Sequence, residues 1–240
     1  MTLFFTLLFI VAFLYASVGH GGASGYIALM VIYSISPDVI KPTALLLNIF
    51  VSSVAFIQFY RGSHFKFKTF LPFALASIPL SFIGGLIVLD GDVYKKILGV
   101  VLIIPIVRFL FYKNAAEDDI KPANFPLSLL IGGIIGLLSG MLGIGGGIIL
   151  SPVLLFLKWT DQKQTAAISA LFILVNSLSG LAGQLTKGIY FDANMILYVV
   201  VAFAGGLCGA YFGSLKFNQV LLKRILAVVL IIASCKLLFS

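Results

Sequence analysis

Long apolar stretches separated by short polar segments dominate the chain. Helices are predicted over residues 1–18, 24–35, 42–60, 69–89, 94–112, 127–142, 148–157, 165–185, 192–213 and 220–239. Several of these stretches approach the ~20 apolar residues that an α-helix needs to cross a bilayer. The alternation of polar and apolar residues that marks an outer-membrane barrel does not extend over a useful length. The pattern therefore predicts an all-α polytopic membrane protein.

Two glycine runs interrupt this apolar pattern, the first within residues 19–25 and the second over residues 143–147. Glycine is less favourable than alanine in a helix interior by ~1 kcal/mol, so three or four glycines together predict a helix break. In lipid, a broken helix leaves backbone N–H and C=O groups unpaired, which is tolerated only inside protein or beside a water-filled cavity. We predict that the two breaks meet near the membrane midplane and form a site for a small anion.

The two halves of the chain resemble each other. Residues 95–104 and 223–232 are identical at eight of ten positions, and the glycine runs recur at an offset of 124 residues. We therefore predict an internal duplication with a first repeat over 1–112, a cytoplasmic linker over 113–126 and a second repeat over 127–240. Each repeat is expected to contain one broken or re-entrant helix pair followed by three transmembrane helices.

The distribution of basic residues indicates how the repeats are oriented. The chain has 16 Lys and Arg against eight Asp and Glu, a net charge of +8. If each glycine-interrupted segment returns to its starting side, the second repeat is inverted and 11 basic residues face one side against five on the other. If each segment crosses fully, the repeats are parallel and the split is eight against eight. The positive-inside rule favours the asymmetric arrangement, so an inverted-topology duplication with both termini outside is predicted.

Inverted repeats with discontinuous helices place their binding site near the midplane, between the repeats. Helices that restart after the glycines would aim free N–H groups and the positive dipole end at an anion. The candidate substrate-binding residues are therefore the glycines of both runs and the polar residues near them. They are Gly19, His20, Gly21, Gly22, Ser24, Asn48, Ser52, Gly143, Gly145, Gly146, Gly147 and Asn176.

Two questions about these candidates stay open at the level of sequence. The serines and asparagines are suited to binding a substrate and equally to interhelical hydrogen bonding, a common use of such residues in lipid. His20 is the one titratable side chain within a glycine run. It is suited to proton coupling or to contact with the anion, and equally to the structural role of a neutral histidine bonded to backbone.

Other functional classes find no support in the chain. The sequence contains no Walker motif, no Cys/His set with metal-ligand spacing and no Ser/His/Asp constellation, and no Asp or Glu lies deep in a predicted span. We therefore expect no enzyme activity, no cofactor and no metal. Because the basic residues flank apolar segments, they are suited to anchoring at a lipid bilayer, and no nucleic-acid partner is expected.

The second glycine run, Gly140–Gly147 with Pro152 soon after it, resembles the sulfite exporter TauE/SafE family of membrane permeases. The likeness covers essentially the whole chain. The first run departs from the family pattern, because His20 stands in it and Ala23 replaces a glycine. The resemblance implies a multi-pass protein of the cytoplasmic (inner) membrane that moves small sulfur-containing anions such as sulfite and organosulfonates.

We therefore expect a secondary transporter that moves a small anion by alternating access. An anion or proton channel on the same scaffold is the alternative. The exact substrate, the coupling ion, the direction of transport and the oligomeric state, a homo-oligomer included, stay open.

Overall fold

The computed structural model describes residues 2–17, 22–111, 120–188, 193–213, 228, 230–232 and 234–239 of the chain. Its helices are α1 (Thr2–Ser17), α2 (Ala23–Ile32), α3 (Pro37–Arg61), α4 (Phe67–Leu86), α5 (Gly91–Phe111), α6 (Phe125–Leu142), α7 (Gly147–Phe156), α8 (Gln162–Leu185) and α9 (Ala193–Gly213). A further helical segment lies near the C-terminus, over residues 234–239.

The structure is 84% helical, and the described residues contain no strand. Four of the described helices, α3, α4, α6 and α8, are long and apolar enough to cross a membrane. The prediction of an all-α polytopic membrane protein is confirmed. Residues 113–119 of the predicted linker lie outside the described residues.

Helices α1 and α2 form one helical hairpin, and α6 and α7, which the second glycine run joins, form another. In the first hairpin, the rings of Phe4, near the start of α1, and Tyr33, just after α2, have centroids 5.1 Å apart. In the second, the N–H of Lys121, before α6, donates to the C=O of Lys158, after α7, at 2.7 Å. Helices α2 and α7 have ten residues each, which is ~15 Å or half of the ~30 Å hydrocarbon core. Each of these short helices therefore returns toward the end at which its hairpin begins, and α1 and α2, like α6 and α7, are separate helices as predicted.

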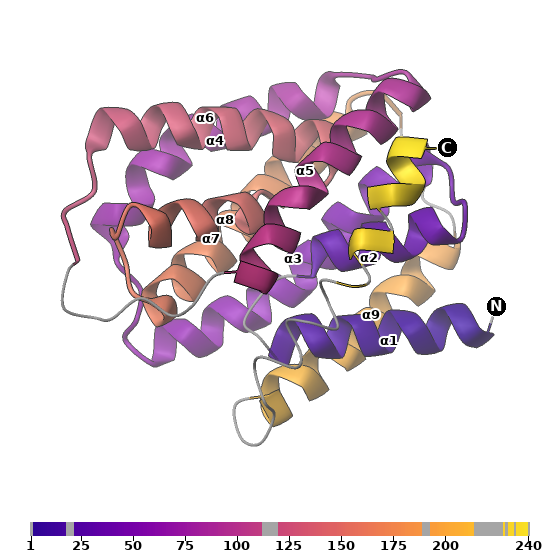
Figure 1. Ribbon diagram of the computed structural model, residues 1–240, viewed down its shortest axis with the longest axis horizontal. Helices are drawn as coiled ribbons and strands as arrows, with labels where there is room; N and C mark the ends of the chain where they lie inside the picture. The colour runs from indigo at the N-terminus through magenta and orange to yellow at the C-terminus, as the bar shows by residue number, and fades with distance from the viewer. Residues whose placement is uncertain are drawn as a thin grey trace.

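The two hairpins open toward opposite ends of the bundle (Figure 1). The first opens at the right-hand end in this view, where both chain termini lie, and the second opens at the left-hand end. We call these the Lys41 end and the Arg61 end, after residues near the start and at the end of α3. Two hairpins that open in opposite directions agree with the predicted inverted duplication.

Helices of the first half of the chain pack against helices of the second half, so the two halves do not form separate bodies. Helix α6 packs along α4, α1 packs along α9, and α3 and α8 contact each other between them. A Cβ added at Gly136 of α6 would overlap the carbonyl oxygen of Ser77, and one added at Gly209 of α9 would overlap that of Phe13. Small residues let helix backbones approach this closely in lipid. The glycines on these helices therefore fix both inter-repeat contacts.

Several helices begin earlier than the sequence pattern predicted. Helix α3 begins at Pro37, five residues before the predicted start at Pro42, with Ser36 at its N-cap position. Helices α6 and α8 begin two and three residues before their predicted starts. The side chains of Asn124 and Asp161 accept hydrogen bonds from backbone N–H groups three residues on, at 3.0 and 2.8 Å. Such caps satisfy N–H groups that a helix start leaves unpaired, which extends the helix into polar sequence.

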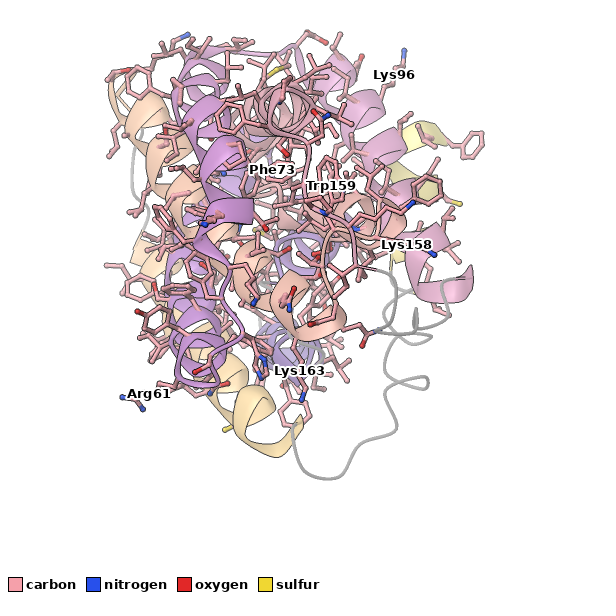
Figure 2. The ribbon with its side chains drawn as sticks, turned by 90° about the vertical axis from the view of Figure 1, so that its left-hand side faces the viewer. Arg61, Phe73, Lys96, Lys158, Trp159 and Lys163 are labelled. Atoms are coloured by element: carbon pink, nitrogen blue, oxygen red, sulfur yellow. The ribbon has the colours of Figure 1, made fainter. Side chains whose placement is uncertain are left out.

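The Arg61 end carries outward-pointing basic side chains. Figure 2 views the molecule from this end, and Arg61 and Lys163 point outward from the helices. The rings of Phe73 and Trp159 lie buried among the helices, with centroids 6.1 Å apart. Basic residues at the end of a helical bundle are typical of a membrane–water interface.

Candidate functional site

The second glycine break uses backbone conformations that favour glycine. Gly143, Gly145 and Gly146 have φ angles of 79°, 69° and 75°, in the left-handed region that only glycine enters without strain. Gly143 ends α6 and donates its N–H to the C=O of Ser139 at 2.9 Å. Gly146 is the N-cap of α7. These conformations reverse the chain between two helices within four residues, 143–146.

Helix α7 starts with unpaired N–H groups. No backbone carbonyl in the described part of the chain accepts a hydrogen bond from the N–H of Gly147 or Ile148. No side chain caps this helix start either, because the N-cap residue is a glycine. The first N–H groups of a helix carry the positive end of its dipole, equivalent to ~0.5 of an elementary charge. The start of α7 therefore favours a negatively charged group.

Two polar side chains approach this break from α3 and α8. A Cβ added at Gly145 would lie 2.8 Å from Asn48 Nδ2 and 3.0 Å from Ser177 Oγ. Both side chains are fully buried, with 0% of their surface exposed. The break is thus bordered by one amide from the first half of the chain and one hydroxyl from the second.

These side chains have no hydrogen-bond partner among the described residues. Both polar atoms of the Asn48 amide and the hydroxyl of Ser177 lack a hydrogen bond. Asn176 donates from Nδ2 to the C=O of Phe172 at 2.8 Å, but its Oδ1 is also unpartnered. Each buried polar group left in this state costs ~1–3 kcal/mol. Native proteins retain few such groups, so this cluster indicates a place where a ligand or water is bound.

Two other predicted residues form hydrogen bonds within their own helices. Ser52 donates its hydroxyl to the C=O of Asn48 at 2.6 Å, and the C=O of Gly147 accepts from Ser151 Oγ at 2.8 Å. The Ser52 hydroxyl is thereby used within α3. The structure brings Asn48, but not the Ser52 hydroxyl, to the glycine break.

The first break is lined by tyrosines. Gly22 is the N-cap of α2, with a φ angle of 82°, and a Cβ added there would lie 2.5 Å from Tyr26 Oη. Ser24 is fully buried, and its Oγ lies 2.6 Å from Tyr15 Oη, so the two hydroxyls form a hydrogen bond. Three further predicted residues of this break lie outside the described residues: Gly19, His20 and Gly21. The proton-coupling role of the histidine among them stays a prediction.

Two residues that support the second break were not predicted as part of it. A Cβ added at Gly143 would lie 2.9 Å from the backbone oxygen of Lys41. The hydroxyl of Tyr94 donates to the C=O of Leu142 at 3.1 Å, and the Lys41 Nζ lies 4.6 Å from the centroid of the Tyr94 ring. The sequence prediction placed Lys41 in a loop, because the predicted helix began one residue after it. No local signal in the sequence marked Tyr94.

Comparisons with known proteins identify the relatives of this chain. The model of the sulfite exporter TauE/SafE family matches residues 4–237. The probable membrane transporter protein y4hK of Sinorhizobium fredii is 38% identical over 236 residues, which cover 96% of this chain and 95% of that protein. The probable membrane transporter protein YunE of Bacillus subtilis is 23% identical over 226 residues, covering 86% of this chain and 82% of that protein.

No solved structure matches this chain significantly. The family match nevertheless spans nearly all of the sequence, both hairpins and the glycine break between α6 and α7 included. The chain therefore belongs to the sulfite exporter TauE/SafE family and is a multi-pass membrane transporter.

Proposed function

We propose that this transporter carries a small anion, a sulfur oxyanion or an organosulfonate, through the second glycine break by alternating access. The observation that carries the proposal is the unpartnered set formed by Asn48, Ser177 and the first N–H groups of α7. Each of these groups can donate a hydrogen bond to an oxyanion. Because position 145 is a glycine, no side chain of its own stands between its backbone and these donors.

The donors at this break are neutral. An amide, a hydroxyl and backbone N–H groups can replace the hydration of an anion without the strength of a buried ion pair. A transporter needs its substrate to bind and also to leave, so neutral donors suit transport better than a permanent countercharge at the same place. The positive end of the α7 dipole supplies the preference for negative charge.

Alternating access would use the exchanged packing of the two halves. The hairpin α1–α2 packs on α9, and the hairpin α6–α7 packs on α4 through α6. The moving bodies would then be these two groups, rocking on either side of α3 and α8, and not the two halves of the sequence. The Arg61 end would face the cytoplasm of a cell with this protein in its inner membrane, as the positive-inside rule favours.

The test is uptake of labelled sulfite and of a labelled short alkanesulfonate into proteoliposomes. We expect saturable uptake that is accelerated by unlabelled anion on the opposite side. Asn48→Leu removes the amide at similar volume and should lower uptake by about 100-fold, since it removes one or two hydrogen bonds to a charged substrate. Ile57→Leu, on an exposed position of the same helix, is the matched control and should transport normally.

This test distinguishes a loss of uptake from a loss of folding. Asn48→Leu breaks no internal hydrogen bond of the side chain, so the thermal unfolding midpoint in detergent should stay constant or rise. Asn48→Asp adds a negative charge at the same place and should also stop uptake. Normal uptake by a folded Asn48→Leu protein would refute the proposed site, and flux that never saturates would favour the channel alternative.

A further inference from the structure

A separate cavity lies at the Lys41 end of the bundle. It has a volume of about 330 Å³ and lies between the start of α3, the segment after α4 and the end of α8. Its charged and polar lining residues are Asp38, Lys41, Gln184 and Lys187. A water molecule occupies ~30 Å³ in the liquid, so the cavity has room for a small hydrated anion.

Lys41 is a buried cation that forms no salt bridge in the described part of the chain. Only 8% of its surface is exposed, and no other Lys, Arg, Asp or Glu whose side chain the structure describes is buried. The one salt bridge among these residues joins Lys95 and Asp92, so Asp38 acts on Lys41 electrostatically without a direct ion pair. The Lys41 Nζ lies over the Tyr94 ring, 4.6 Å from its centroid. A buried ammonium without a directly bound carboxylate is expected to attract an anion.

The cavity carries net positive charge. Two lysines, Lys41 and Lys187, and one aspartate, Asp38, give it a formal charge of +1. The lysines come from different halves of the chain, one from α3 and one from just after α8. An anion in the cavity would therefore hold together the two helices that also border the glycine break.

Helices α3 and α8 extend from the cavity to the glycine break. Asn48 follows Lys41 by seven residues on α3, and Gln184 follows Ser177 by seven residues on α8. Residues seven apart lie on the same face of a helix, ~10 Å apart along its axis. The backbone of Lys41 also abuts Gly143 at the edge of the break. Both helices thus present one polar residue at the cavity and one at the break.

We infer that this cavity is an anion-capture site, in which the Lys41 ammonium binds a small sulfonate or sulfur oxyanion before the anion reaches the glycine break or after it leaves. The choice of anion rests on the proposed function, whereas the site itself rests on the cavity and the unpaired cation. Binding of the anion at the Lys41 ammonium would raise the local anion concentration close to the glycine break.

The test measures anion binding at the cavity without measuring transport. Val88 lines the cavity and is 73% exposed, so Val88→Cys, in a protein with Cys208 and Cys235 changed to Ala, provides a thiol at its rim. An anionic thiosulfonate reagent should label this cysteine, and methanesulfonate should slow the labelling. We expect Lys41→Met to raise the half-protecting methanesulfonate concentration by about tenfold or more, as loss of a charge-assisted contact does.

Three further variants make the result decisive. Lys41→Arg keeps the charge and should restore most of the protection. Lys96→Met removes an exposed lysine that does not line the cavity and should change nothing. Asn48→Leu should stop transport and leave the protection intact, which separates this inference from the proposed function. Absence of protection in the parent protein, or equal loss in Lys41→Met and Lys96→Met, would overturn the inference.

Discussion

The two helical hairpins share a backbone design and differ in the side chains around it. Both carry a glycine N-cap in the left-handed conformation and a ten-residue second helix. At the described part of the first break, tyrosines lie against the glycine, Ser24 is hydrogen-bonded to Tyr15, and one hydroxyl, that of Tyr26, has no partner among the described residues. At the second break, the Asn48 amide and the Ser177 hydroxyl border the glycines, and neither has a partner among the described residues. The duplicated backbone provides two helix starts, but the unpaired amide lies at the second.

This difference indicates separate roles for the two breaks. A hydrogen-bonded hydroxyl pair between packed aromatic rings stabilises the first hairpin. A cluster of unsatisfied donors destabilises the free protein and is expected where a ligand supplies the missing hydrogen bonds. The Lys41 backbone also abuts the second break, and its side chain lines the cavity at the start of α3. We therefore expect substitutions at the second break to affect transport and substitutions at the first to affect stability.

The largest effect is expected from alanine at one positive-φ glycine of each break, Gly145 and Gly22. Both Gly145→Ala and Gly22→Ala place a Cβ in the left-handed region, at a cost of ~1–2 kcal/mol. At position 145 the Cβ also displaces Asn48 and Ser177. Uptake per folded molecule should fall by about 100-fold for Gly145→Ala and by about tenfold or less for Gly22→Ala.

Initial uptake rates in proteoliposomes, normalised to protein that elutes as a single species in size-exclusion chromatography, check this comparison. Gly91→Ala is the control, because a Cβ at that glycine meets nothing within 4 Å. Equal losses for Gly145→Ala and Gly22→Ala would remove the functional distinction between the breaks.

A smaller effect, on stability alone, is expected at the first break. Tyr15→Phe leaves the buried Ser24 hydroxyl without its partner and should lower the free energy of unfolding by ~1–3 kcal/mol. The double variant Tyr15→Phe/Ser24→Ala removes both hydroxyls and should recover part of that loss. Thermal unfolding in detergent measures both changes. Loss of uptake by folded Tyr15→Phe protein would instead assign this pair to the transport path.

The smallest effect is expected when a single tyrosine hydroxyl is removed, and it should differ between Tyr94 and Tyr26. Tyr94 donates to the C=O of Leu142, so Tyr94→Phe should lower the free energy of unfolding by ~1 kcal/mol. The Tyr26 hydroxyl is buried and has no hydrogen-bond partner in the part of the chain that the structure describes, so Tyr26→Phe should be neutral or slightly stabilising. Unfolding midpoints of the two variants, measured side by side, test this difference, and equal destabilisation would contradict it.

The helix breaks and the membrane-spanning class followed from the sequence because they depend on local composition. Apolar runs and clustered glycines act within one or two helical turns, and the basic residues report orientation by their number on each side. The residues at which the helices begin were harder to predict from the sequence. Capping by Asn124 and Asp161 extends α6 and α8 beyond their apolar sequence. Helix α3 begins at Pro37, a residue suited to the first turn, and so includes Lys41.

The candidate site itself was decided by the tertiary structure. The site brings together residues that are far apart in the sequence. Gly145 follows Asn48 by 97 residues, and Ser177 follows it by 129. The sequence marked Asn48 and Asn176 as polar residues in apolar helices, but not which of them lies without partners at the break. Hydrogen-bond satisfaction depends on neighbours from other helices, and so does the position of the Lys41 ammonium over the Tyr94 ring. The sequence therefore determined where the helices break, and packing between the two halves decided which buried polar groups have no partner among the described residues.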